Sequence, residues 1–139
     1  MKVMVCLDDD NGMLFNGRRQ SRDRLLREDM INLLQGARLW MNEYSAKQFE
    51  EGPEESIIAD EKFLEKANEN DYCFVEDRKL LLYEPAIREL ILYRWNRKYP
   101  ADMFFDIDLS HWELVNRTEF PGSSHVKITK EIYRPKHMG

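Results

Sequence analysis

Five arginines lie close together in the first quarter of the chain, and their type and spacing indicate chemistry. They are Arg18, Arg19, Arg22, Arg24 and Arg27. A guanidinium presents a fork of donors that matches phosphate and carboxylate groups, and a helix N-terminus adds backbone donors for the same anions. Arg24 and Arg27 are three residues apart, so they would share one face of a helix. We therefore expect a site for a small anion here, with Arg18, Arg19, Arg22 and Arg24 as its contacts.

Acidic residues among these arginines support a second interpretation. Asp23, Glu28 and Asp29 could balance the positive charges on a solvated face that binds no ligand. Ser21 is expected to cap a helix, with Asp23 in its first turn, where a carboxylate stabilises the helix dipole by roughly 0.3–1 kcal/mol. His125 could donate a proton, although an isolated histidine is more often structural.

Composition and missing motifs exclude several classes of protein. The chain has 139 residues, of which 42% are apolar and 34% charged, and this fits one domain with its own core. Two cysteines and three histidines give no zinc-site spacing, and His-x-His-x-Asp-His is absent, so we expect neither a metal site nor a zinc hydrolase. The phosphate-binding glycine loops and Gly-x-Ser-x-Gly are absent too. The net charge of −5 disfavours nucleic acid as a partner.

The hydropathy pattern predicts a cytoplasmic protein without a membrane partner. No apolar run approaches the roughly 18 residues of a membrane span. The first apolar stretch is too short for a secretion signal and is followed at once by acidic residues. Cys6 and Cys73 each lie in an apolar run, so we expect buried thiols rather than a disulfide.

The elements that would position these residues alternate between strands and helices. Short apolar runs predict strands, and apolar residues at helical spacing after Ser21 predict a helix that stops at Gly36. Strands are expected at 2–7, 37–41, 56–59, 72–75, 90–95, 104–105, 112–120 and 125–133, and shorter helices at 45–49, 60–67 and 78–83. The pattern predicts a single α/β domain over residues 1–139, with a mixed, mainly parallel sheet and flanking helices.

Several stretches of the sequence, in this order, resemble dihydrofolate reductases. Leu90–Trp95, Tyr99–Phe105 and Ile107–Leu114 are similar to a strand, an acidic turn and a Trp-containing strand of that family. Four other stretches are similar to its first strand and loop, its substrate-binding helix, the strand before its cofactor loop and its final strand; they are Leu7–Leu14, Arg22–Leu25, Leu39–Ser45 and Ser123–Thr129. The resemblance covers most of the chain and implies the dihydrofolate reductase fold, shortened mainly between residues 43 and 77.

The same resemblance implies roles for particular residues. Asp23 falls at the family's catalytic carboxylate, which hydrogen-bonds a pterin ring and assists its protonation. The arginine segment would border the central cleft. The positions that hold NADPH in the family differ here. Asn42 and Glu43 replace a Gly-Arg pair that meets the 2′-phosphate, and Glu76 and Asp77 replace a Gly-Gly pair beside the pyrophosphate.

Two further recognition elements of the family are missing. Residues 50–55 contain no arginine to pair with the folate tail, and no Pro-Trp lies between Asn16 and Asp23. The leading hypothesis is therefore a divergent dihydrofolate-reductase-like protein without NADPH-dependent reductase activity. It needs no cofactor, and its cleft binds a small anionic molecule.

Two alternatives remain open from the sequence. The first is a reductase with an altered cofactor or substrate, which would use NADPH or NADH; loss of the 2′-phosphate arginine makes NADH the less disfavoured of the two. The second is a protein-interaction or regulatory module that presents a sheet edge or its acidic loop to a partner. Fold resemblance alone does not decide among the three hypotheses.

Overall fold

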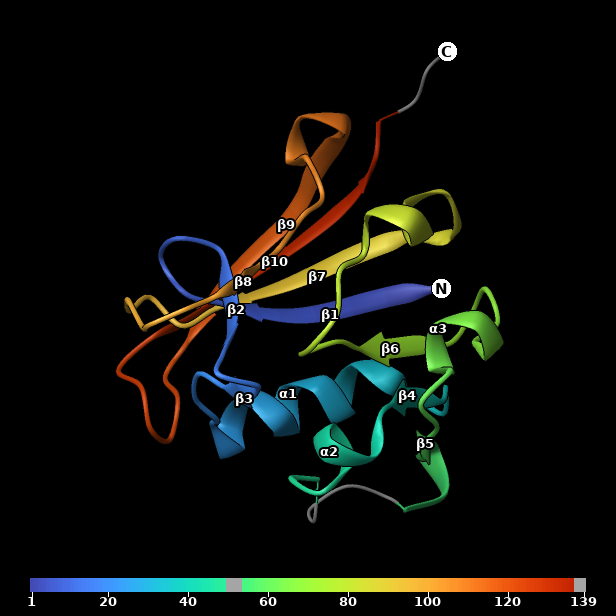
Figure 1. The fold of residues 1–139 in the computed structure, drawn as a ribbon, viewed down its shortest axis with the longest axis horizontal. Coiled ribbons are helices and arrows are strands. Elements are labelled where there is room, and N and C mark those ends of the chain that lie inside the picture. Colours follow the sequence, from blue (N-terminus) through green and yellow to red (C-terminus); the bar gives the residue numbers. More distant parts are fainter. Residues whose placement is uncertain (50–53, 137–139) are drawn as a thin grey trace.

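A seven-stranded sheet forms the centre of the protein (Figure 1). The structure is a computed structural model that describes residues 1–49 and 54–136. The strands are β1 (Lys2–Leu7), β4 (Leu39–Met41), β5 (Ile57–Ala59), β6 (Tyr72–Phe74), β7 (Glu89–Arg94), β9 (Trp112–Phe120) and β10 (Ile128–Pro135). Their order is β5-β4-β6-β1-β7-β10-β9. The first five in this order run parallel, and β10 pairs antiparallel with β7 and β9. The predicted mixed, mainly parallel sheet is confirmed.

The central strands β1 and β7 are buried on both faces. Val3 and Leu90, which lie opposite each other in the register, belong to the core on one face. Met4 and Ile91, the next pair, belong to the core on the other face. A strand covered on both sides has no polar face, and this is why residues 2–7 and 90–95 appear in the sequence as continuous apolar runs.

Helix α1 (Arg24–Leu34) covers one face of the sheet. Its buried residues Leu26, Met30 and Leu34 recur at four-residue spacing and pack in the same core as Met4. The helix ends where Gln35 adopts a left-handed conformation, with φ 44°, followed by Gly36 at φ 92°. The predicted stop at Gly36 is therefore confirmed to within one residue.

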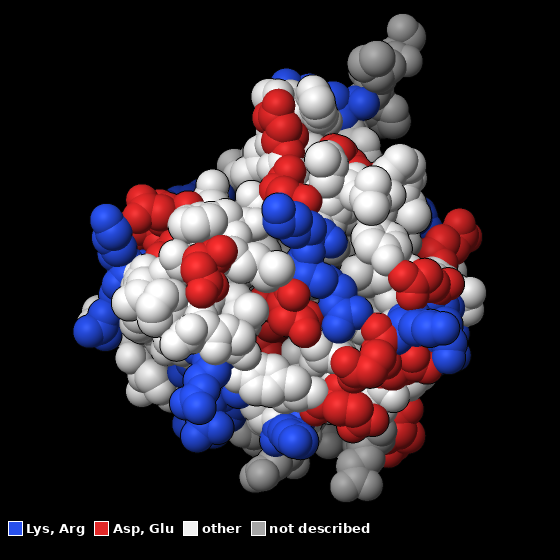
Figure 2. Space-filling view, in the orientation of Figure 1, with Lys and Arg blue, Asp and Glu red and all other residues white. Residues whose placement is uncertain are grey.

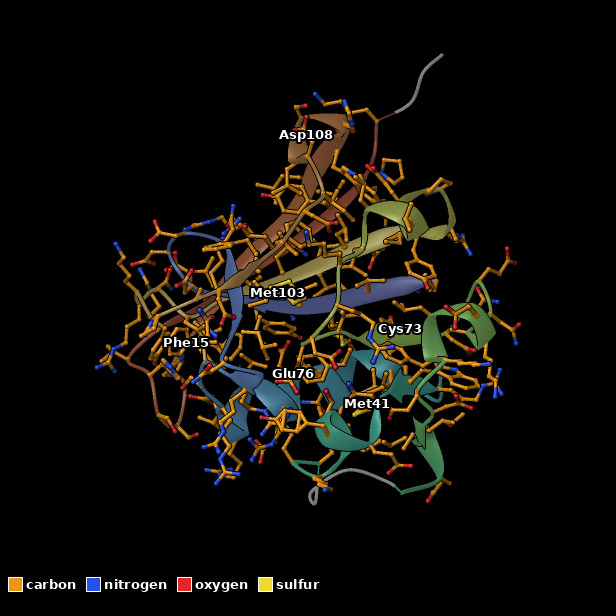
Figure 3. All side chains as sticks on the ribbon, viewed as in Figure 1. Phe15, Met41, Cys73, Glu76, Met103 and Asp108 are labelled. Atoms are coloured by element: carbon orange, nitrogen blue, oxygen red, sulfur yellow. The ribbon has the colours of Figure 1, made fainter. Side chains whose placement is uncertain are left out.

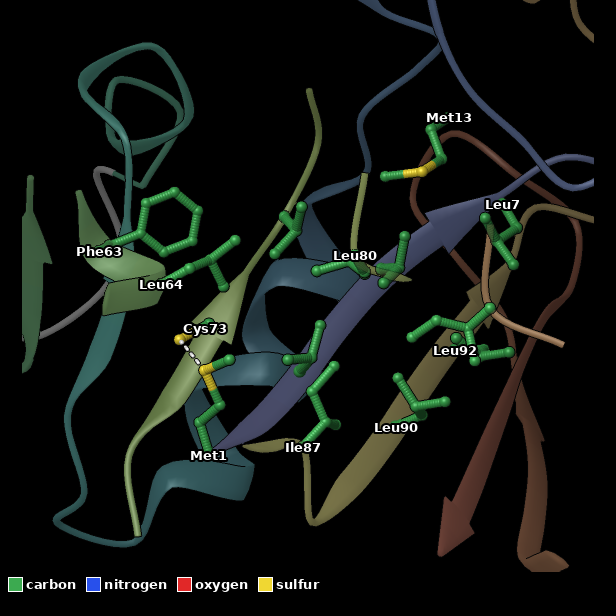
Figure 4. Packing of buried hydrophobic residues seen from close by; sticks show 14 of the residues in the cluster. Met1, Leu7, Met13, Phe63, Leu64, Cys73, Leu80, Ile87, Leu90 and Leu92 are labelled. Atoms are coloured by element: carbon green, nitrogen blue, oxygen red, sulfur yellow. Dashed lines mark hydrogen bonds between the residues drawn. The ribbon is translucent and has the colours of Figure 1, made fainter. Parts of the chain in front are cut away.

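Short elements cover the opposite face of the sheet (Figure 4). They include α3 (Phe63–Lys66) and the 3₁₀ turn η2 (Leu81–Ala86); the other short helices are α2 (Glu43–Ala46), η1 (Glu54–Ser56) and η3 (Leu109–His111). The predicted helix at 60–67 is reduced to one turn. The helix predicted at 78–83 lies three residues later, because the carboxylate of Asp106 accepts the N–H groups of Leu80 and Leu81 where the turn begins.

A small antiparallel sheet lies beside the end of β1. It consists of β2 (Gly12–Phe15), β3 (Arg18–Arg19) and β8 (Met103–Phe104), in the order β3-β2-β8. Asn16 and Gly17 join β2 to β3, and both have positive φ, 56° and 73°. This two-residue turn is typical of a hairpin. The sequence analysis did not predict the two strands that this turn connects.

The two cysteines lie on opposite sides of the large sheet. Cys6 and Cys73 are free thiols, half-buried and buried, and they pack in the cores on opposite faces of the sheet. Cys73 is buried as expected, whereas Cys6 is only half-buried. Within the described residues, no helix is both long and apolar enough to cross a membrane.

Candidate functional site

Three segments meet beyond the carboxyl ends of β1, β6 and β7. They are residues 18–24, which lead into α1, residues 42–48 around α2, and the loop 121–127 between β9 and β10. In sheets of parallel strands, ligands bind in the crevice beyond these ends. The candidate functional site therefore lies here. It consists of a hydrogen-bonded cluster around Asp23, a buried ion pair and a group of basic side chains.

Asp23 is the N-cap of helix α1. Its Oδ1 accepts hydrogen bonds from the backbone N–H groups of Leu25 and Leu26, at 3.0 and 3.2 Å. The predicted cap at Ser21 is therefore wrong. The reason is that the Asp23 side chain, two residues closer to the helix, satisfies the N–H groups that a cap at Ser21 would have needed to reach.

The same carboxylate also holds the loop 121–127. Its Oδ1 accepts from the N–H of Ser123 at 2.9 Å, and its Oδ2 accepts from the N–H of Ser124 at 2.8 Å and from Nδ1 of His125 at 3.1 Å. Gly122 lies so close that a Cβ there would overlap Oδ2 of Asp23. The predicted strand at 125–133 begins only at Ile128, because the residues before it form this loop.

These hydrogen bonds determine the charge of Asp23. Burial alone would raise its pKa, but the bonds from Ser123, Ser124, His125 and Leu26 outweigh burial and lower the pKa to about 2. The side chain has 0% exposed surface. Asp23 is therefore ionised at neutral pH, and both of its oxygens are occupied by donors of the protein. The contact with a pterin ring that the resemblance implies remains a prediction.

His125 connects Asp23 to two hydroxyl groups. Its Nε2 lies 2.9 Å from the hydroxyl of Tyr99 and 3.2 Å from Oγ of Ser21. The imidazole stacks on Trp95, with ring centroids 4.5 Å apart and planes inclined by 24°. With only 3% of its side chain exposed, His125 is fixed in place by both ring nitrogens and by one ring face. The sequence suggested a structural histidine but did not identify these partners.

A buried ion pair joins the segment before α1 to the end of β6. Nε of Arg19 lies 3.0 Å from Oε2 of Glu76, and the guanidinium lies over the ring of Tyr44, 4.2 Å from its centroid. Oε1 of Glu76 also accepts from Ser45 Oγ at 2.7 Å and from Gln48 Nε2 at 3.2 Å. Glu76 is 7% exposed and lies beside α2, where it is labelled in Figure 3.

This ion pair closes the crevice at the sheet edge. The space that remains has a volume of about 10 Å³ and is lined by Cys6, Val75 and Trp95 together with Arg19 and Ser21. A single buried water occupies roughly this volume. A pterin or a nicotinamide ring therefore does not fit between these side chains as they are placed here.

A separate pocket on the surface is lined mainly by basic side chains. Arg22, Arg24, Arg27 and Lys47 surround a volume of about 320 Å³, and Ser123 and Ser124 form part of its wall. We call it the basic pocket. Arg24 also pairs with Glu28 at 2.8 Å, across one turn of α1. Figure 2 shows basic side chains at the lower left of the molecule, where β3 and the start of α1 lie in Figure 1.

The four arginines predicted as ligand contacts lie in three different surroundings. Arg22 and Arg24 line the basic pocket. Arg19 is held in the ion pair with Glu76. Arg18 is exposed and lines an open hollow of about 640 Å³ beside Phe15. Arg18 and Arg19 form strand β3 of the hairpin with β2, whereas Arg22 and Arg24 follow that hairpin in the chain. The sequence analysis had not predicted the hairpin.

The positions to which the sequence resemblance assigns cofactor binding carry acidic and amide side chains. Asn42 caps α2 by accepting from the N–H of Ser45 at 2.8 Å, and its Nδ2 donates to Asp77 at 2.8 Å. Asp77 also pairs with Arg78 at 3.0 Å. Glu43 is exposed as the first residue of α2. Residues 50–53, part of the acidic segment singled out in the sequence, lie outside the described residues.

Two parts of the site were missed by the sequence analysis. Lys47, the residue after α2, lies twenty-five residues beyond Arg22, and only the fold of the chain brings the two into one pocket. The consecutive serines Ser123 and Ser124 contribute mainly through their backbone N–H groups, which have no sequence signature. Within the described residues, no cluster of three or more His, Cys, Asp or Glu side chains could hold a metal ion.

Comparison with known proteins identifies the fold. No family model and no curated protein matches the sequence. Among solved structures, the chain is similar to a dihydrofolate reductase from Enterococcus faecalis complexed with NADP(H) and RAB-propyl, with a TM-score of 0.69 and 12% identity. The match covers 98% of this chain and 96% of that one. The chain therefore has a dihydrofolate-reductase-like fold with a divergent sequence.

Proposed function

We propose that this dihydrofolate-reductase-like protein binds a small, multiply charged anion in the basic pocket and does not catalyse NADPH-dependent reduction. The observation that carries the proposal is the convergence of Arg22, Arg24, Arg27 and Lys47 on one pocket. They come from two segments that are distant in the sequence. The net charge of the chain is −5, so a pocket lined by four cations is a local reversal of the overall charge.

Side chains, rather than the helix terminus, would make the contacts with the anion. The N–H groups of the first turn of α1 are already used, since Arg24 donates to Ser123 Oγ at 2.9 Å and Leu25 and Leu26 donate to Asp23. Arg22 and Lys47 bring a guanidinium and an ammonium group to the wall of the pocket, and Glu28 neutralises part of the charge of Arg24. This arrangement favours phosphate or carboxylate groups with two or more negative charges.

The closed crevice supports the absence of reductase activity. The solved relative was complexed with NADP(H), so a nicotinamide cofactor is the natural alternative for this fold. Here Arg19 and Glu76 leave a volume of about 10 Å³ at the sheet edge, which does not accommodate a nicotinamide ring. Asn42 and Asp77 bind each other beside it. The cytoplasm is the proposed location, since both cysteines are free thiols.

Thermal unfolding with a panel of anions tests the proposal. Inorganic phosphate, pyrophosphate and citrate should raise the melting temperature above that in chloride of equal ionic strength. A ligand at a hundred times its Kd adds about 2.7 kcal/mol to the unfolding free energy. Arg22→Ala and Lys47→Ala should reduce this effect.

Arg134→Ala is the matched control for these variants. Arg134 is 64% exposed and lies at the opposite end of the sheet, where it pairs with Glu89. The control should keep the full effect of the anions. Equal responses in all four proteins, or none in any of them, would overturn the proposal. The consumption of NADPH or NADH with dihydrofolate should stay at background, and turnover would favour the reductase alternative instead.

A further inference from the structure

A second hollow shares part of its wall with the basic pocket. It has a volume of about 430 Å³ and is lined by Trp95, Asn96 and Arg97 and by residues 124–127. We call it the loop hollow. Ser124 is exposed and lines the basic pocket as well. The two hollows therefore adjoin at Ser124, and a molecule that reaches from one into the other passes over this residue.

Contacts within the protein hold the walls of the loop hollow in place. Nδ2 of Asn96 donates to the carbonyl oxygen of Lys127 at 3.1 Å. The rings of Trp95 and His125 join the same two segments by stacking, with their centroids 4.5 Å apart. The loop that both hollows share is also anchored by Asp23. Because these walls are already ordered, a ligand that binds between them loses little free energy in ordering them.

The loop hollow carries positive charge of its own. Arg97 lines it and is exposed, and no carboxylate of the described residues forms an ion pair with this guanidinium. Lys127 also lines the hollow. Its side chain is 53% exposed and lies 3.5 Å from Glu119 at the surface, where an ion pair contributes little. Cationic side chains therefore line both of the hollows that adjoin at Ser124.

The surroundings of these cations favour a chain of phosphates over a strand of nucleic acid. Proteins that bind single strands stack successive bases on aromatic side chains. The aromatic side chains that line the two hollows are Trp95 and His125, which stack on each other and are only 4% and 8% exposed. They offer little ring surface to a base. Guanidinium and ammonium groups, in contrast, bind phosphate oxygens directly.

We infer that the basic pocket and the loop hollow form one groove, which binds a short linear polyphosphate across Ser124. The inference rests on the proposed binding of an anion in the basic pocket and adds the length and form of that anion. Pyrophosphate occupies the basic pocket alone, whereas phosphates further along a longer chain reach Arg97 and Lys127 in the loop hollow. Because the second contact is then made within one complex, a longer chain binds more tightly than pyrophosphate.

Calorimetric titration at constant ionic strength, with pyrophosphate, tripolyphosphate and a longer linear polyphosphate, tests the inference. Affinity for the wild-type protein should rise with chain length, by roughly tenfold or more from the shortest to the longest chain. Arg97→Ala and Lys127→Ala should lose most of this rise and bind pyrophosphate as the wild-type protein does. Lys98→Ala is the matched control, because Lys98 is 76% exposed, pairs with Asp10 and lines neither hollow. It removes the same charge beside Arg97 and should keep the rise.

Pyrophosphate separates a failure of this inference from a failure of the proposed function. A rise with chain length that Arg97→Ala and Lys127→Ala lose and Lys98→Ala keeps supports the groove. If pyrophosphate binds but the affinity does not rise with length, or rises equally in all three variants, the groove is wrong and the basic pocket stands. If no chain binds the folded wild-type protein, both are wrong. Tighter binding of an oligothymidylate with as many phosphates would also overturn the inference, because it would assign the groove to nucleic acid.

Discussion

Replacement of Asp23 by alanine should destabilise the protein more than any other single acidic substitution in the site. The carboxylate accepts six hydrogen bonds, from α1 and from the loop 121–127. Its removal leaves the N–H groups of Ser123 and Ser124, and those of the first turn of the helix, without their acceptor. It also removes the partner of His125.

The size of the effect follows from these contacts. Loss of an N-cap costs about 1 kcal/mol, and each hydrogen bond to a charged group is worth roughly 1.5–3 kcal/mol, although such values do not add fully. Removing one partner from a buried charged network typically costs about 3–5 kcal/mol. We expect Asp23→Ala to lose about 4 kcal/mol, a large part of the roughly 5–15 kcal/mol that stabilises an ordinary domain.

Urea unfolding followed by tryptophan fluorescence and circular dichroism measures this loss. Trp95, one of the three tryptophans of the chain, stacks on His125, so part of the fluorescence comes from the site. Asp9→Ala is the control, because Asp9 is exposed, and it should change the unfolding free energy by less than about 0.5 kcal/mol. Asp23→Asn provides a milder variant if the alanine variant does not fold. A loss below about 1 kcal/mol in both Asp23 variants would refute the account of Asp23 as the link between helix and loop.

Three further predictions concern the same edge of the sheet. Gly122→Ala should lower the unfolding free energy by about 1–3 kcal/mol, because its Cβ overlaps the carboxylate of Asp23; an unchanged urea midpoint would contradict this. Acid should remove up to about 2 kcal/mol of stability as pH falls from 3.8 towards about 2, since the folded-state pKa of Asp23 is depressed; Asp23→Asn should lack this component in urea titrations at each pH. Arg19→Met should lower the unfolding free energy by about 3 kcal/mol, because it leaves Glu76 buried without its cation. Adding Glu76→Gln to this variant should recover part of the loss. An unchanged unfolding free energy of Arg19→Met in urea would show that the ion pair does not stabilise the fold.

The sequence was most informative where burial dictates residue type. The strand at 2–7 was predicted at its observed bounds, because a strand buried on both faces leaves a continuous apolar run. The strand at 112–120 was also predicted at its bounds, although only Trp112 in it is buried. The start of α1 was predicted at the wrong cap, since Ser21 and Asp23 are both good capping residues and only the packing of the loop 121–127 selects between them. Local sequence contains no information on that choice.

The candidate site was predictable only in part for the same reason. The arginine cluster was visible, but its division between an ion pair, an open hollow and the basic pocket depends on a hairpin and on the position of α2. The resemblance placed the acidic residue Glu76 beside the pyrophosphate of a cofactor. In the structure it binds Arg19 across 57 positions of the chain, a long-range contact that spacing cannot reveal.

Calorimetric titration of pyrophosphate into the purified protein at low salt tests the central claim most directly. The account predicts measurable binding to the wild-type protein and to Arg134→Ala, and weakening with added salt as for any contact between exposed charges. Arg22→Ala and Lys47→Ala should each bind roughly tenfold more weakly, the equivalent of about 1.4 kcal/mol for one lost charged contact. Affinity that is the same in all four proteins would contradict a binding site in the basic pocket, as would the absence of binding to the folded wild-type protein.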